Sequence, residues 1–197
     1  MKLGTAALLL IVPAALAAQQ PQPNTAGGPI TTAIRGTYAR LHRLLPMAFD
    51  SIPADKFGYK PTPAQQSIGY IAAHLASDNY FFCSDFGDKK PTRPAEETST
   101  NDSTKAANWT KDQLVTQLKA SIAFCDDAFT QLDDTKMSEM LTVNLPNGQT
   151  RQVARFNRAY GHALDMTDHY SQIANYMRLN GMLPPSALPQ RPRPAGN

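Results

Sequence analysis

Two histidines and one aspartate recur at helical spacing near the C-terminal end of the chain, where they could bind a metal ion. His162, Asp165 and His169 lie at steps of three and four within residues 160–185, whose pattern predicts one long helix ended by glycine and prolines. Asp165 and His169 are one turn apart, the spacing by which a helix presents two ligands to one ion. His162 and His169 are about 10 Å apart along a helix, too far to bind the same ion. We expect His74, on another helix, to complete the site.

Other kinds of chemistry find no support in the sequence. No Ser/His/Asp triad, phosphate-binding loop or dinucleotide fingerprint occurs. Ser171 points away from His169 on helical spacing, and Gln172 either lines the site or points outward. The formal net charge is +3 and the Lys and Arg residues are scattered, so we expect no nucleic-acid partner.

The two ends of the chain have the composition of segments outside a folded domain. Residues 1–18 combine Lys2, a short apolar run and the small residues Ala15 and Ala17, which predicts a secretory signal peptide. This run is too short to span a membrane and no later apolar run replaces it. We therefore expect an exported protein, periplasmic or extracellular, without a membrane span. Residues 19–29 predict a flexible leader and residues 187–197 a disordered, Pro-rich tail.

Residues 30–186 predict one all-α domain, a four-helix bundle. Thr31 or Thr32 is expected to cap the first helix and Ser67 the second, while the third starts near Asp112. The polar residues 85–110 form a long crossover between helices two and three, which leaves helix three free to run parallel to helix two. Apolar residues at helical spacing define the core faces. They are Ile34, Tyr38, Leu41, Leu45 and Phe49 in the first helix, Ile68, Ile71, Leu75 and Phe82 in the second, and Leu114, Leu118, Ile122, Cys125, Phe129 and Leu132 in the third.

Two further features concern single residues. His42 lies beside the apolar stripe of the first helix, on a mostly polar shoulder, and we expect it to face solvent. Asn147 and Gly148 stand between apolar stretches and predict a hairpin turn, although Pro146 weakens the first strand.

The chain has two cysteines. Cys83 lies near the end of the second helix and Cys125 in the second half of the third. If these helices are parallel neighbours, the two sulfur atoms lie at similar heights, and an exported protein would keep them as a disulfide. The alternative is that both are small buried apolar side chains.

Several stretches resemble the DinB-like family of four-helix bundle proteins. One group is similar to the family's second-helix block, in which the histidine is a metal ligand: residues 57–63 (FGYKPTP), 68–74 (IGYIAAH) and 81–83 (FFC). Another group resembles the closing helix, in which one histidine follows a second by four residues: residues 168–172 (DHYSQ) and 176–186 (YMRLNGMLPPS). These blocks occur in the family's order.

The resemblance implies an up-down-down-up bundle that binds a divalent ion such as zinc or nickel through three side chains. It assigns this role to His74, His169 and position 165, where this chain has aspartate in place of the usual histidine. A carboxylate lowers the preference for nickel, and it suits zinc, iron(II) or manganese. Alternatively, Asp165 pairs with His162 or His169 in a buried polar cluster without metal. His162, one turn from Asp165, either contacts Asp165 and orients it, or lies between helices with its own hydrogen bonds satisfied.

Two functions follow from these observations. The first is an exported metal-dependent enzyme, a hydrolase or a transferase acting on a small-molecule substrate, with zinc as the first expectation and nickel, iron or manganese as alternatives. The second is a non-catalytic helical binding or scaffold domain with a degenerate metal site. Some proteins of the DinB-like family transfer thiols such as bacillithiol or mycothiol, and many pair, so the resemblance also implies a homodimer.

Overall fold

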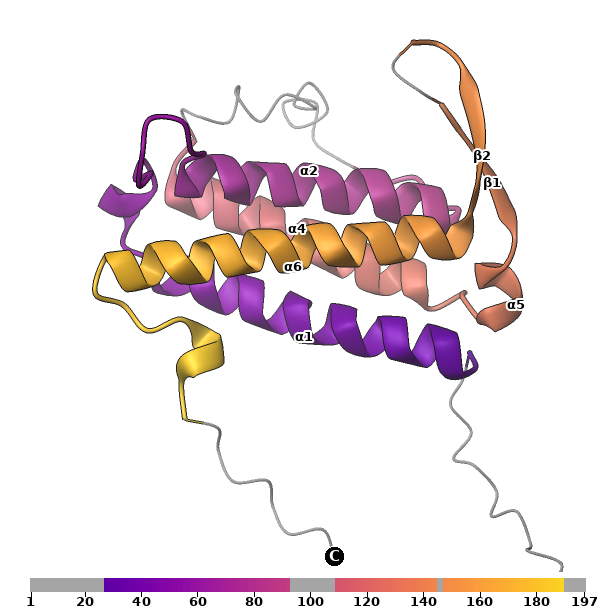
Figure 1. Cartoon of the computed structure of the whole chain (residues 1–197), viewed down its shortest axis with the longest axis horizontal. Helices are drawn as coiled ribbons and strands as arrows, with labels where there is room; N and C mark the ends of the chain where they lie inside the picture. Colours follow the sequence, from indigo (N-terminus) through magenta and orange to yellow (C-terminus); the bar gives the residue numbers. More distant parts are fainter. Residues whose placement is uncertain (1–26, 93–108, 145–146, 190–197) are drawn as a thin grey trace, which may run out of the picture.

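The computed structural model describes residues 27–92, 109–144 and 147–189, and its main body is a bundle of four long helices (Figure 1). These helices are α1 (Pro29–Ser51), α2 (Ile68–Gly87), α4 (Lys111–Phe129) and α6 (Arg155–Leu179). Five short elements connect or extend them: η1 (Ala54–Lys56), α5 (Asp134–Met137), β1 (Met140–Asn144), β2 (Thr150–Ala154) and η3 (Pro185–Ala187). The predicted signal peptide, residues 93–108 of the crossover, Pro146 and residues 190–197 of the tail lie outside the described residues.

The four helices run up, down, down and up, as the family resemblance implies. In Figure 1, α1 and α6 run in one direction and α2 and α4 in the other. Contacts at both ends of the α2–α4 pair confirm that these helices are parallel. An added Cβ at Gly69 would lie 3.4 Å from Leu114, and one at Gly87 would lie 2.5 Å from the Cβ of Ala128. Glycine at position 87 therefore allows a helix contact that a larger residue would prevent.

Local sequence determines which residue caps the start of α2, but not which residue caps the start of α1. Ser67 caps α2 by accepting from the backbone N–H of Tyr70, as predicted. The prediction that Thr31 or Thr32 caps α1 is wrong, because α1 begins at Pro29. Asp134 of α5 instead accepts from the backbone N–H groups of Ile30 and Thr31 and from the Thr31 hydroxyl, at 3.2, 2.7 and 2.8 Å. The N–H groups at this helix end are thus satisfied by a residue distant in sequence.

The predicted hairpin is present and leads directly into α6. β1 and β2 pair antiparallel with Thr142 opposite Gln152, and the hairpin projects from one end of the bundle (Figure 1). Because β2 ends at Ala154, α6 begins at Arg155, before the predicted span of 160–185. The buried guanidinium of Arg155 fixes this junction by donating to the carbonyl of Phe86 and to the carboxylate of Glu139.

The predicted core faces are buried, and so is one histidine that was expected to face solvent. Apart from Phe82, which is only partly buried against the core, the apolar positions expected in the first three helices are at most 7% exposed. His42, expected in solvent, is also 7% exposed, and its Nδ1 lies 2.7 Å from Oδ1 of Asp126. The prediction for His42 is wrong because α4 packs over that shoulder of α1 and supplies a carboxylate partner. Among the described helices, none is both long and apolar enough to cross a membrane.

Candidate metal centre

The structure brings His74, Asp165 and His169 together between α2 and α6. One potential ligand atom from each side chain lies within 4.8 Å of the others. The Nε2 atom of His169 is 3.5 Å from Oδ1 of Asp165, and the ring centroids of His74 and His169 are 4.7 Å apart. These are the three residues that the sequence selected.

A chain of hydrogen bonds from the same helix orients His169. Its Nδ1 lies 3.2 Å from Oε1 of Gln172, which can only accept, so Nδ1 carries the hydrogen. The Gln172 amide in turn donates to the hydroxyl of Tyr176, which donates to the backbone carbonyl of Gln66. The lone pair of Nε2 is therefore left on the side of Asp165. Metal-binding histidines are held in this way by a partner on the second nitrogen.

Asp165 supplies a negative charge that its protein neighbours leave partly unsatisfied. Its Oδ2 atom is buried and has no hydrogen-bond partner in the described part of the chain. Burial tends to raise the pKa of Asp165, but the hydrogen bond that the protonated ring of His169 donates from Nε2, together with the charges of His169, His74 and His162, holds it below its ordinary value. Burial likewise opposes the charged form of His169, whereas Asp165 raises the pKa of that imidazole above its ordinary value. A buried carboxylate oxygen without a donor fits a bound cation.

Asp78 is a fourth acidic or imidazole group near the centre, and sequence reasoning assigned it no role. Its Oδ2 lies 3.4 Å from Nε2 of His74, one turn earlier on α2. Burial raises the pKa of Asp78 to about 6, and the charge of Asp165 adds to this, while His74, His169 and Arg158 act in the opposite direction. The four-residue spacing of Asp78 from His74 repeats that of His169 from Asp165 and was visible in the sequence.

The centre is open on one side. The side chains of His74 and Asp165 are 26% and 31% exposed, while that of His169 is 11% exposed. Tyr70 stacks on His74, with ring planes 19° apart. An ion held here would keep coordination positions that solvent or a small molecule can reach, as catalytic rather than structural sites do.

His162 lies deeper in the bundle and binds another partner. Its Nδ1 is 2.9 Å from the hydroxyl of Tyr38, which also lies 2.9 Å from the carbonyl of Ala159. Burial lowers the pKa of His162 to about 3, against the opposite effect of the Asp165 charge. Among the described residues, His162 makes no hydrogen bond to Asp165, so the two residues interact through charge alone.

Cys83 and Cys125 are joined by a disulfide in the structure, with their Cα atoms 5.2 Å apart. Both side chains are fully buried between α2 and α4. The pairing of these two residues was one of the two alternatives that the sequence left open.

A family model describing the DinB superfamily matches residues 37–165, a range that contains His74 and Asp165 and ends before His169. None of the curated proteins compared with the chain matches it. Similar solved structures include a conserved protein from Enterococcus faecalis, at 18% identity and a TM-score of 0.55, covering 77% of this chain and 96% of that one.

A protein assigned to the DinB family from Exiguobacterium sibiricum is 19% identical with a TM-score of 0.53, covering 79% of this chain and 94% of that one. The mycothiol-dependent maleylpyruvate isomerase is 15% identical with a TM-score of 0.50. The match covers 74% of this chain and only 58% of the isomerase. At these identities the likenesses show the fold.

Proposed function

The chain belongs to the DinB superfamily, and we propose that it binds one divalent metal ion through His74, Asp165 and His169 and acts as a metal-dependent hydrolase or transferase. One observation carries this proposal. Two imidazoles and a carboxylate from two helices approach within 4.8 Å of one another at a site that is open on one side.

The residues present fit a divalent ion of intermediate hardness. Two imidazole nitrogens and one carboxylate oxygen suit zinc, iron(II) or manganese. Nickel is less favoured at this site than it would be at a site with a third imidazole in place of the carboxylate. A bound ion would supply Lewis acidity to a polar atom of the substrate. Around it, Gln172 keeps the Nε2 lone pair of His169 directed at the site, and Asp165 supplies a charge that offsets part of the charge of the ion.

We favour hydrolysis over transfer of a thiol. The isomerase with a similar fold depends on mycothiol, as its name states, but low-molecular-weight thiols are mainly cytoplasmic. The leader in residues 1–18 supports export of this chain, and a buried disulfide suits an oxidising compartment. We therefore propose an exported protein, periplasmic or extracellular, and mass spectrometry of the mature N-terminus tests this.

Elemental analysis of the protein purified without an affinity tag tests the metal centre. We expect about one equivalent of metal per chain, lost in both His74→Ala and His169→Ala. His42→Ala is the matched control, because it removes another buried histidine that contacts Asp126 rather than the site. Metal retained in both site variants would contradict the proposal.

A second measurement separates an enzyme from a binding domain. The metal-loaded protein, the chelated protein and His169→Ala are assayed with a panel of esters, amides and phosphate esters. Turnover that needs both the ion and His169 supports a hydrolase. Stoichiometric metal without turnover of any substrate would favour the non-catalytic alternative.

A further inference from the structure

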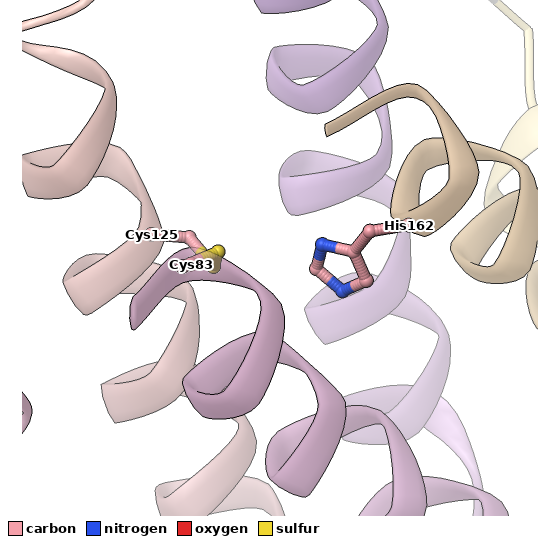
Figure 2. Close-up of side chains that lie close together, drawn as sticks. All are labelled: Cys83, Cys125 and His162. Carbon is pink, nitrogen blue, oxygen red and sulfur yellow. A yellow bond between two sulfur atoms is a disulfide. The ribbon is translucent and has the colours of Figure 1, made fainter. Parts of the chain in front are cut away.

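A second cluster of groups that can bind metal lies in the interior of the bundle. Cys83 from α2, Cys125 from α4 and His162 from α6 are each 0% exposed. One potential ligand atom of each lies within 4.8 Å of the others. Figure 2 shows the His162 ring extending from its helix toward the paired sulfur atoms. This cluster shares no residue with the group of His74, Asp165 and His169.

The hydrogen bonds of Tyr38 leave His162 with a free lone pair. The Tyr38 hydroxyl has one hydrogen, which it donates to the carbonyl of Ala159. It must then accept from Nδ1 of His162, so the hydrogen of the neutral ring is on Nδ1. The other nitrogen, Nε2, is buried and has no hydrogen-bond partner within the described ranges. An orphaned acceptor inside a protein marks a place for a donor or a cation.

We propose that Cys83, Cys125 and His162 form a metal site for a thiophilic divalent ion such as Zn²⁺, available only when the disulfide is reduced. A phosphine or a dithiol supplies two electrons to the S–S bond, and each sulfur takes up one proton while the reductant is oxidised. Binding of the ion to the two sulfur atoms then releases those two protons. The same cysteines thus serve as a disulfide under oxidising conditions and as ligands under reducing ones.

The charge balance of the assembled site and the softness of its ligands both favour a thiophilic divalent ion in this position. Two thiolates balance the charge of a divalent cation and the imidazole is neutral, so the assembled site carries no net charge into the apolar interior. Thiolate and imidazole ligands select zinc-like ions over the hard cations that prefer oxygen. Zinc–sulfur bonds of about 2.3 Å place two sulfur atoms about 3.8 Å apart, a separation compatible with the short Cα–Cα distance of 5.2 Å.

Cobalt titration of a variant that lacks the first site tests the proposal. The full chain carrying His74→Ala and His169→Ala is reduced with a phosphine, freed of the reductant without oxygen, and titrated with Co²⁺. We expect one equivalent of Co²⁺ with a thiolate-to-cobalt charge-transfer band, and none in the oxidised protein. The band distinguishes this site from the histidine and carboxylate centre, which has no sulfur ligand, so the result is independent of the proposed function.

Two further variants in the same background identify the ligands. Cys83→Ser with Cys125→Ser is the matched control without a bridge or thiolates, and it should bind no Co²⁺. His162→Leu should lose saturable binding. Charge-transfer absorption unchanged in His162→Leu would overturn the proposal, since it would reveal a dithiol acting alone.

Circular dichroism covers the case in which reduction unfolds the chain. Recovery of helical signal on adding one equivalent of Zn²⁺ would support the site. A reduced chain that stays folded without binding Co²⁺, or that stays unfolded with Zn²⁺ present, would overturn it.

Discussion

The imidazole of His169 meets the amide of Gln172 through a contact of 3.2 Å between Nδ1 and Oε1, and this contact leaves Nε2 for the candidate metal centre. Gln172→Ala should therefore weaken metal binding by about 10- to 100-fold, the usual effect of removing a group that orients a ligand. Competition with a calibrated chelator measures the change. Ser171→Ala is the control, because Ser171 is exposed and donates to the carbonyl of Thr167. Equal affinities in the two variants would show that Gln172 does not orient the ligand.

The identity of residue 165 should determine which metal is preferred. Asp165→His replaces a hard oxygen by an imidazole nitrogen, so we expect the site to remain and its preference to move from zinc or manganese toward nickel. Metal content after growth with equal concentrations of these ions measures the preference. If Asp165 is only an ion-pair partner of His169, the metal content will not respond to the substitution.

The buried imidazole of His162 should make the fold sensitive to acid. Its pKa is lowered to about 3 by burial, below the value near 6.5 of an exposed histidine, so the unfolded chain binds this proton first. The contribution of neutral His162 to stability is present above pH 6.5 and is lost as the pH falls toward 3. Between pH 7 and pH 5 the wild type should lose about 2 kcal/mol more than His162→Gln, measured by urea unfolding. Equal losses of unfolding free energy in the wild type and in His162→Gln would show that His162 is not the source of the acid sensitivity.

The disulfide closes a long loop and should stabilise the fold. Cys83 and Cys125 are separated by 42 residues, for which the chain-entropy model gives a stabilisation of about 4 kcal/mol. The double variant Cys83→Ala with Cys125→Ala should show a loss of this order in urea unfolding. The phosphine-reduced wild type, without added metal, is the control. A double variant as stable as the oxidised protein would show that the bridge constrains little.

Tyr38 should stabilise the interior through its hydroxyl group. Tyr38→Phe leaves the buried Nδ1 of His162 without its partner, at a cost of about 1–3 kcal/mol, and removes the additional hydrogen bond to the carbonyl of Ala159. Thermal or urea unfolding measures this cost. Tyr160→Phe is the matched control, because Tyr160 is 47% exposed and should give no change. A Tyr38→Phe variant as stable as this control would show that the hydroxyl contributes nothing.

The sequence predicted the parts of the fold that depend on local patterns. Apolar spacing identified the buried faces of α1, α2 and α4, and Ser67 marked the start of α2. It could not place Asp134 at the start of α1 or Asp126 beside His42, because both contacts join residues far apart in the chain. These contacts exist only after the helices have packed.

The candidate metal centre likewise combines residues that the sequence could identify with contacts that it could not. One-turn spacing and the family resemblance together selected His74, Asp165 and His169, which the structure places within 4.8 Å of one another. The role of Gln172 stayed open because side-chain direction, rather than spacing, decides whether it contacts His169. Asp78 carried the same spacing signal as His169 and was overlooked.

The two kinds of link in this bundle would not hold all four helices equally. The disulfide fastens α2 to α4, and an ion at His74, Asp165 and His169 would fasten α2 to α6. In the described part of the chain, α1 is held by packing, hydrogen bonds and ion pairs alone. When the protein begins to unfold, α1 should be the first helix to detach from the bundle. Its backbone amides should therefore exchange hydrogen with solvent before those of the other three helices.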